Sequence, residues 1–186
     1  MRKLWQLLNL PRSIPALWMF HHLPCREAVF ADLARKNETA CWQSLHRSLL
    51  YDPLFRKIFF ARTNPYAPLL TKLSKLFYRP FPSMELHSDK IGGGMCIYHG
   101  YSTIVFARSI GSNFTVYQQV TIGRGKKING NDIPIIGNNV TVYAGAIIIG
   151  GITIGDNAVI GAGTVVTKDV PANTTVVGAA PRYIEK

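Results

Sequence analysis

The sequence is poor in acidic residues and in cysteine, and it has no long apolar run. Of its 186 residues, 10 are Asp or Glu and 21 are Lys or Arg, which gives a formal net charge of +11 at pH 7. The three cysteines (Cys25, Cys41 and Cys96) are widely spaced and form no zinc-ligand pattern, so we expect free thiols in a reducing compartment. No apolar stretch reaches the roughly 20 residues of a transmembrane helix. Because Pro11 and Arg12 interrupt the apolar start, we expect no cleaved secretion signal.

The positive charge is concentrated in the first half of the chain. Residues 1–80 hold 13 Lys and Arg and 4 Asp and Glu, and so carry +9 of the total +11. The basic residues are dispersed, which is typical of solvated helix faces. The sequence has no RNA-binding or helix-turn-helix signature, so we expect no nucleic-acid partner. Peripheral contact with an anionic membrane surface is left open as an alternative.

Residues 1–82 carry helix signals and are predicted to form a helical region. Asp52 before Pro53 is a helix start, with the carboxylate as N-cap and the proline in the first turn. Asn64-Pro65 ends that segment. Apolar stripes at helical spacing predict further helices, and we interpret these stripes as packing faces. They lie at Val29, Phe30, Leu33 and Ala34, at Trp42, Leu45 and Leu49, and in the segment 68–78.

Residues 83–186 are predicted to form a β-helix, because an apolar β-branched residue recurs there every six positions. Neither a helix nor a plain strand keeps this period, which is the signature of hexapeptide β-helix repeats. Each hexapeptide supplies a short strand and a tight turn, with the Ile or Val pointing into a narrow core and Gly, Asn or Asp at the corners. The repeat positions are Ile104, Ile110, Val116, Ile122, Ile136, Val142, Ile148, Ile154, Ile160 and Val166.

The repeat is interrupted twice. Ile91 and Ile97 are six residues apart but out of phase with Ile104, so a register change of one residue is expected between Ile97 and Ile104. The second interruption is a polar segment at about 125–135, which we expect to project as a loop. Projecting loops on a rigid scaffold often carry function, although a tolerated insertion is the alternative.

The repeat segments resemble the hexapeptide-repeat acetyltransferases. The pieces that carry the resemblance are MELHSDKIGGGMCIYHG, QQVTIG with the loop after it, IIGNNVTVYAGAIIIGGITIGDNAVIGAGTVVTKDVP and VVGAAPRYI. Within that superfamily the chain is similar to serine acetyltransferases and to O-acetyltransferases of surface-polysaccharide clusters. The resemblance implies a left-handed parallel β-helix, a homotrimer and acetyl-CoA as donor. Whether trimers pair further, and whether a carrier protein replaces CoA, stays open.

By this resemblance His99 is the general base and Glu85 is the carboxylate that orients it. A neutral imidazole, with an ordinary pKa of about 6.5, accepts the proton of an attacking hydroxyl and returns it to the leaving thiolate. A carboxylate at its other nitrogen fixes the tautomer and stabilises the imidazolium. Because Glu85 and His99 are separated by about one coil, they are expected on neighbouring rungs of one face. The alternatives are that His99 is a corner residue without a catalytic role and that Glu85 has no catalytic role.

A CoA arm requires small side chains along the coils and cations for its phosphates. The pairs Ala144-Gly145 and Ala162-Gly163 are the predicted path for the arm, although the same residues also suit tight turns. Lys168 and Arg182 are the predicted phosphate contacts, with solvated side chains as the alternative. No metal is expected.

Two departures from the serine acetyltransferase pattern decide the predicted acceptor. Tyr98 replaces an Asp that in that family holds the amino group of serine, and Ile133 replaces a loop His. With Tyr101 and Gln118, Tyr98 is predicted to bind the acceptor, since aromatic rings suit the apolar face of a sugar. The sequence therefore predicts an acetyl-CoA-dependent O-acetyltransferase that modifies a sugar hydroxyl of a bacterial surface polysaccharide or its precursor. The alternative is serine O-acetyltransferase.

Other classes are less well supported by the residues. A β-helical carbonic anhydrase needs three His ligands, and the repeat region contains His87 and His99 alone. A non-catalytic β-helix leaves the pairing of His99 with Glu85 unexplained. The cytoplasm is the expected compartment, with the inner face of the membrane as the alternative place.

Overall fold

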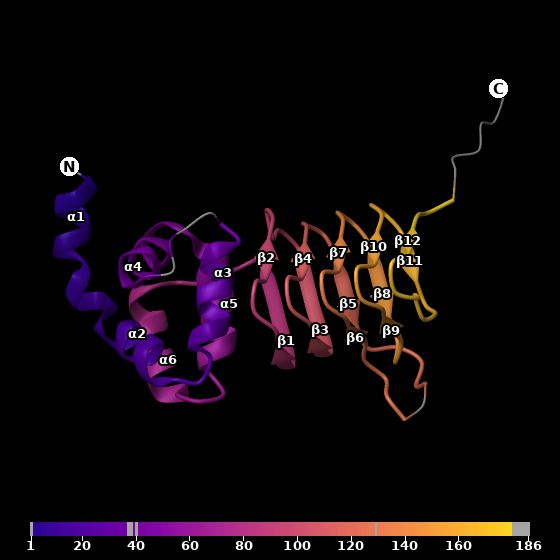
Figure 1. Cartoon of the computed structure of the whole chain (residues 1–186), viewed down its shortest axis with the longest axis horizontal. Coiled ribbons are helices and arrows are strands. Elements are labelled where there is room, and N and C mark those ends of the chain that lie inside the picture. The colour runs from indigo at the N-terminus through magenta and orange to yellow at the C-terminus, as the bar shows by residue number, and fades with distance from the viewer. Residues whose placement is uncertain (1, 37–38, 40, 129, 180–186) are drawn as a thin grey trace, which may run out of the picture.

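The computed structural model describes residues 2–36, 39, 41–128 and 130–179. Within these residues, helices form one end of the molecule and short parallel strands wind into a β-helix at the other (Figure 1). The predicted fold class is confirmed. The helices are α1 (Arg2–Leu8), α2 (Leu10–His22), α3 (Arg26–Ala34), α4 (Trp42–Tyr51), α5 (Pro53–Thr63) and α6 (Pro68–Phe77). The strands are β1 (Met84–Ile91), β2 (Cys96–Ile97), β3 (Thr103–Ile110), β4 (Thr115–Val116), β5 (Thr121–Gly123), β6 (Ile135–Ile136), β7 (Thr141–Val142), β8 (Ile147–Ile149), β9 (Thr153–Ile154), β10 (Val159–Ile160), β11 (Val165–Val166) and β12 (Thr175–Val176).

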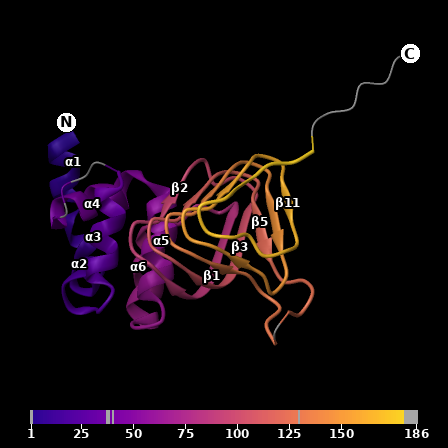
Figure 2. The ribbon, with the colours of Figure 1, turned by 45° about the vertical axis from the view of Figure 1, so that its right-hand side comes forward.

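The strands stack in register into three faces, which the oblique view of Figure 2 shows as successive coils. The first face contains the first halves of β1 and β3, followed by β5, β8 and β11. The second contains the later halves of β1 and β3, followed by β6 and β9. The third contains β2, β4, β7, β10 and β12. Every pairing between these strands is parallel, because each strand meets the equivalent strand of the next coil.

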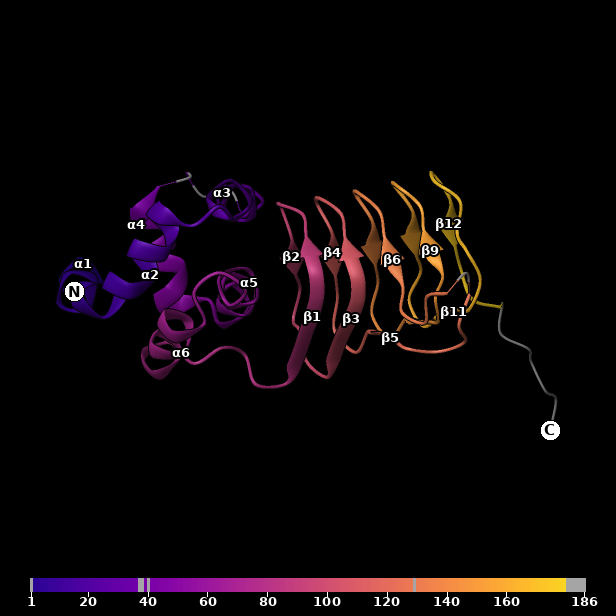
Figure 3. The ribbon, with the colours of Figure 1, turned by 90° about the horizontal axis from the view of Figure 1, so that it is seen from below.

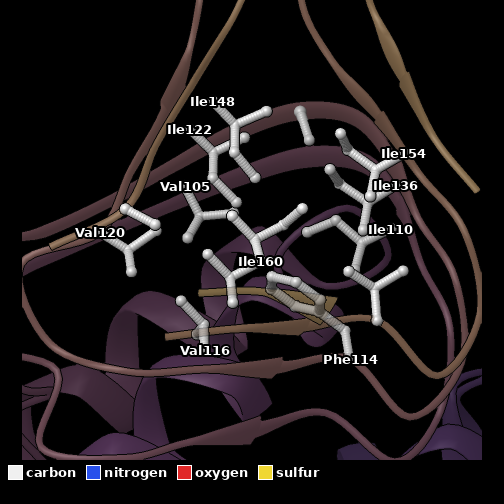
Figure 4. Close-up of a cluster of buried hydrophobic side chains, with 14 of the residues drawn as sticks. Val105, Ile110, Phe114, Val116, Val120, Ile122, Ile136, Ile148, Ile154 and Ile160 are labelled. Atoms are coloured by element: carbon white, nitrogen blue, oxygen red, sulfur yellow. The ribbon is translucent and has the colours of Figure 1, made fainter. Parts of the chain in front are cut away.

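The β-branched residues that the repeat predicts lie in the core of the β-helix, with one exception, together with other apolar residues such as Phe114 and Val120 (Figure 4). Nine of the ten repeat positions are buried, but Ile104 is 43% exposed and Val105 takes its place in the core. The reason is a two-residue insertion at a corner. The N–H of Tyr98 donates to the carbonyl of Val116, and the N–H of Gln119 donates to the carbonyl of Tyr101. Between these two hydrogen bonds, the coil that contains Tyr98 and Tyr101 has two residues more than the coil that follows it. The sequence predicts a register change of one residue. In the structure this change has two parts: two residues are inserted before β3, and the next two core positions, Val105 and Ile110, are five residues apart instead of six.

Asparagine side chains form a ladder along another corner. Asn113, Asn139, Asn157 and Asn173 all have positive φ, between 54° and 60°. Asparagine tolerates this left-handed conformation better than most residues with a Cβ. The side-chain amide of each of the first three donates to the side-chain oxygen Oδ1 of the next Asn, at 3.0, 2.9 and 2.8 Å. The turn residues therefore stabilise one another from coil to coil.

The helical region agrees with the sequence in part. Asp52 caps α5 as predicted, accepting the N–H groups of Leu54 and Phe55 at 3.0 and 2.9 Å. Helices α1 and α2 lie within the predicted helical region, with α1 at its end away from the coils (Figure 3), but no bounds were predicted for them. Pro11, which interrupts the apolar start of the chain, lies in the first turn of α2, where proline is tolerated. No helix in the described part of the chain is long and apolar enough to cross a membrane.

Helix α6 corrects the interpretation of its apolar stripe as a packing face. It buries Thr71 and Ser74 and packs Leu70 against the helical core, whereas Leu69, Leu73 and Leu76 point outward. Thr71 donates a hydrogen bond to Thr63 of α5 at 3.0 Å, so a polar contact fixes this helix on the helical core. Helical spacing alone does not tell which side of a helix meets the core.

A buried ion pair joins the helical region to the first coil. Arg62 of α5 donates to both carboxylate oxygens of Asp32 of α3, at 2.7 and 2.8 Å, and their side chains are 3% and 1% exposed. Arg62 also donates to the carbonyls of Ile91 and Gly92, and Asp32 accepts the N–H of Met95. Burial raises the pKa of Asp32, and Arg62 opposes that shift. The pair therefore fixes two helices and the start of the β-helix against one another.

The polar segment between β5 and β6 projects from the coils near β9, at the lower right of Figure 1. Its base is tied down by an ion pair of 3.1 Å between Arg124 and Asp132, and by a hydrogen bond of 3.0 Å from Arg108 to Asn131. The carbonyl of Asn131 lies so close over Gly151 that a Cβ there would clash with it. The segment is thus a projecting loop with a fixed base.

We expect Arg62→Met to lower the free energy of unfolding by about 3–5 kcal/mol, because it leaves the Asp32 carboxylate buried without its partner. Urea unfolding measures this. The double variant Asp32→Leu, Arg62→Met should recover much of the loss. Lys36→Met, which breaks a pair with Asp52 whose side chains are 22% and 28% exposed, should cost less, about 1 kcal/mol. A loss below 1 kcal/mol for Arg62→Met would contradict the structural role of the pair.

We expect Gly151→Ala to lift the loop from the coil, at a cost of about 1–3 kcal/mol. Trypsin should then cleave several-fold faster after the exposed Lys126 and Lys127. The control is Gly123→Ala, where an added Cβ meets nothing within 4 Å. Equal cleavage rates for the two variants would show that the base of the loop is not fixed at Gly151.

Candidate functional site

One corner of the β-helix gathers most of the residues predicted to act. Backbone hydrogen bonds of 2.8–3.1 Å run from Gln119 to Tyr101, from Gly145 to Gln118 and from Gly163 to Ala144. Tyr101, Gln118, Ala144 and Ala162 therefore stand in one row, one residue per coil, and we call them the corner row. The residues that follow them, Ser102, Gln119, Gly145 and Gly163, all have φ between 50° and 70°.

His99 belongs to the two-residue insertion that begins this corner. His99 and Gly100 both have left-handed backbone angles, with φ of 64° and 60°. This conformation is uncommon for a residue with a Cβ, and such residues are often found at functional sites. Gly100 has no room for a Cβ, which would meet Leu54 of α5. The insertion thus places an exposed imidazole at the head of the corner row.

Three tyrosines stack beside the corner row and were not predicted as a unit. The rings of Tyr98 and Tyr117 are 4.9 Å apart, and those of Tyr117 and Tyr143 are 5.0 Å apart, with interplanar angles of 19° and 26°. The neighbouring Cys96 raises the pKa of Tyr98, so its phenol is neutral at neutral pH. The signal was available in the sequence, because each tyrosine follows the two strand residues in CIYHG, TVYQQV and TVYAGA.

Glu85 is not paired with His99 in the described structure. Its side chain lies on the outer side of β1, where Oε2 is 3.9 Å from Nε2 of His87, and both side chains are largely exposed. In the part of the chain that the structure describes, no hydrogen bond or ion pair joins Glu85 to His99. The expected pairing of these two residues therefore stays a prediction.

Gln118 carries an unused acceptor in the corner row. Its Oε1 is buried and has no hydrogen-bond partner among the described residues. Leaving a buried polar atom unpaired costs free energy, so a hydrogen-bond partner for this atom is expected. Gln118 is thus placed to accept a hydrogen bond from a ligand.

The row beyond Gln118 is open enough for a linear ligand. A Cβ built on Gly163 would meet nothing within 4 Å, and one on Gly145 would meet its nearest atoms at 3.8 Å. Lys168 is exposed and follows β11 at the next corner. Arg182, the other predicted phosphate contact, lies outside the described residues.

A groove of about 400 Å³ lies between α5, α6 and β1, and it was not predicted. Lys57, Lys75 and His87 line it together with Ile133, which is buried rather than projecting from the loop. Burial and the neighbouring Lys75 lower the pKa of Lys57, and Glu85 opposes that shift. Within the described ranges, no three His, Cys, Asp or Glu side chains converge as metal ligands would.

Known proteins with similar sequences match about three fifths of this chain. Residues 133–168 match the family model described as bacterial transferase hexapeptide (six repeats). The serine acetyltransferase of Synechococcus elongatus is 40% identical over 119 residues, 63% of this chain and 49% of that protein. The serine acetyltransferase of Helicobacter pylori strain J99 is 41% identical over 105 residues, 55% of this chain and 61% of that protein. The chain thus spans half to three fifths of the length of these two relatives.

Solved structures cover more of the chain. Serine acetyltransferase from Neisseria gonorrhoeae superposes with a TM-score of 0.68 at 29% identity, over 89% of this chain and 70% of that one. The soybean enzyme superposes with a TM-score of 0.61 at 31% identity, over 86% of this chain and 68% of that one.

These similarities correct the predicted acceptor. The prediction of a polysaccharide-modifying enzyme is wrong, because relatives at about 40% identity are serine acetyltransferases, which supports the alternative. It gave two single-residue departures, Tyr98 and Ile133, more weight than the similarity along the rest of the repeat. With hexapeptide repeats and 31% identity over 68% of the soybean enzyme, the chain belongs to the serine acetyltransferase family of hexapeptide-repeat transferases.

Proposed function

We propose that the chain is an acetyl-CoA-dependent serine O-acetyltransferase with His99 as general base. The observation that carries the proposal is the exposed His99 at the head of an open row of small residues, in a chain similar to serine acetyltransferases. The donor is a thioester, and the acceptor is the hydroxyl of serine.

In the proposed reaction, His99 removes the proton of the serine hydroxyl as the oxygen attacks the thioester carbonyl. A C–O bond forms, the C–S bond breaks, and the imidazolium returns the proton to the departing thiolate. This requires the imidazole of His99, which is exposed at the head of the corner row, to reach both substrates. Glu85 remains the proposed orienting carboxylate, and this role requires it to leave His87 for His99 when substrates bind.

The donor is proposed to lie along the corner row. Ala144, Gly145, Ala162 and Gly163 present no side chain larger than a methyl group, so a pantetheine arm has space beside them. Lys168 is the proposed contact for a phosphate of CoA. By the same similarity the working form is proposed to be a homotrimer in the cytoplasm, where acetyl-CoA is available.

Serine binding must be arranged differently from the pattern in which an Asp precedes the catalytic His. Tyr98 is neutral there and cannot form an ion pair with the ammonium group of serine. The unpartnered Oε1 of Gln118 is the acceptor proposed to take that role, because it lies one coil along the same corner. A neutral acceptor binds an ammonium group less tightly than a carboxylate does.

Thiol release from acetyl-CoA by the purified protein tests this proposal. We expect release that depends on L-serine, and a fall of at least about 10²-fold in kcat for His99→Ala, as expected for loss of a general base. The control is His21→Ala, an exposed histidine of α2, which should keep the wild-type rate. Absence of serine-dependent release, or a wild-type rate for His99→Ala, would overturn the proposal.

Replacing Tyr98 tests how serine is held. We expect Tyr98→Asp to lower the KM for L-serine by about 10-fold, because a carboxylate there gains a charge-assisted contact with the ammonium group. Tyr98→Asn is the matched control, since it removes the same ring and has the same size as Asp but no charge. Equal KM values for the two variants would show that the ammonium group does not lie beside residue 98.

A further inference from the structure

The stacked tyrosines belong to one column of the β-helix, and that column continues beyond them. Tyr98, Tyr117 and Tyr143 each follow a strand of the third face, and each donates its backbone N–H to a carbonyl of the next coil. In the next two coils the same position is held by Gly161 and Val177, which follow the paired strand residues of β10 and β12. Figure 1 shows these strands, from β2 to β12, one after another along the molecule. The column therefore consists of three rings, a glycine and a valine.

The glycine leaves one level of this column without a side chain. Neighbouring coils are about 4.8 Å apart, and the rings of Tyr117 and Tyr143 are 5.0 Å apart, so each ring fills one level. Beyond Tyr143 the next side chain in the column is that of Val177, two levels away. Its Cγ1 lies 3.2 Å from the position that a Cβ of Gly161 would take, so the valine forms the floor of the empty level. We call the space bounded by Tyr143, Gly161 and Val177 the open level.

The open level is accessible and suited to a planar ring. Tyr143 is 41% exposed and Val177 is 71% exposed, so neither side chain is covered by the rest of the described chain. Aromatic rings prefer to stack with an offset at the separation that the tyrosines already have. A heterocyclic base stacked on an aromatic side chain gains binding free energy whatever the base, because every base has a π face. The open level thus offers one aromatic side and one apolar side to an inserted ring.

The open level also lies beside the proposed path of the donor. Ala162, which belongs to the corner row, directly follows Gly161. The thioester of acetyl-CoA has to lie at His99, in the same coil as Tyr98, because its carbonyl carbon is the atom attacked. The open level is three coils further along, roughly 14 Å away. Adenine is the planar ring of CoA and lies at the opposite end of that molecule from the thioester, whereas serine has no ring.

We propose that the open level binds the adenine ring of acetyl-CoA, stacked on Tyr143 and resting on Val177. The pantetheine arm then runs back along the corner row to His99. Tyr143 is in this way a specificity-determining residue for the donor, and it favours CoA over a carrier protein, whose phosphopantetheine arm has no adenine. This inference rests on the proposed use of acetyl-CoA, but it does not depend on serine as the acceptor.

Binding of adenosine 3′,5′-bisphosphate, the nucleotide end of CoA, tests the proposal without any acceptor. Titration calorimetry on the full chain should show Tyr143→Ala raising the Kd by about 10-fold, because the stacking of base on ring is lost. Tyr143→Phe keeps the ring and should keep the wild-type Kd. The control is Tyr66→Ala, which removes an exposed tyrosine of the helical region and should also bind as the wild type does. A wild-type Kd for Tyr143→Ala would overturn the proposal.

Thiol release with L-serine separates the nucleotide end of the donor from its arm. We expect Tyr143→Ala to raise the KM for acetyl-CoA by about 10-fold with little change in kcat. The KM for S-acetylpantetheine, which has no adenine, should stay unchanged. An equal rise in KM for both thioesters would show that Tyr143 contacts the arm rather than the base, and would overturn the proposal.

Gly161→Phe is an independent variant, because it places a ring of the chain itself in the open level. The φ of Gly161 is not positive, so a side chain is compatible with the backbone there. We expect the same selective rise in KM for acetyl-CoA, with thermal unfolding as the check that the fold is kept. Should serine-dependent release be absent while bisphosphate binding still depends on Tyr143, serine as acceptor is wrong and the adenine site stands.

Discussion

The ion pair between Asp32 and Arg62 is the contact through which the two halves of the molecule are positioned. Removing two charges from water costs several kcal/mol each, and good geometry with further hydrogen bonds is needed to offset that cost. Here the carbonyls of Ile91 and Gly92 and the N–H of Met95 supply those hydrogen bonds. They also belong to the first coil, so satisfying the charges fixes the chain just before β2. Everything that follows β2, including the insertion with His99, takes its position from this joint.

The candidate site lies where the regular repeat is broken. In an unbroken β-helix each coil places the same side chain over the one before, so a corner presents a uniform row. The insertion of His99 and Gly100 adds a side chain that has no equivalent in the next coil. Beside it the rows remain regular: stacked tyrosines on one side, and Tyr101, Gln118 and two alanines on the other. The regular coils supply rigidity and the irregular one supplies the reactive group, which is the division of roles expected of a functional site.

What the sequence predicted well is local in origin. A few neighbouring positions are enough to predict the period of six residues, the helix cap at Asp52 and the polar segment before β6. The outward orientation of the Ile104 side chain could not be predicted, because the two inserted residues are partly offset by a stretch that is one residue shorter before Ile110. The outward leucines of α6 were not readable either, since the side of a helix that meets the core depends on distant contacts such as that between Thr71 and Thr63. The acceptor was mispredicted because two positions were weighed against a similarity that extends over the whole repeat.

Helix α5 closes one end of the β-helix, with Ile58 inside its core and Leu54 and Ala61 packed against it. A stack of parallel coils ends in a row of unpaired backbone groups, and such an edge is a template for adding further strands from another molecule. The cap converts an open-ended, repeating structure into one with a defined beginning. A chain that started at β1 would keep every residue of the corner row. It would, however, expose the strand edge and the apolar core at that end, and other chains could then add to it and form a fibre. The helical half is therefore part of what keeps this repeat a discrete molecule.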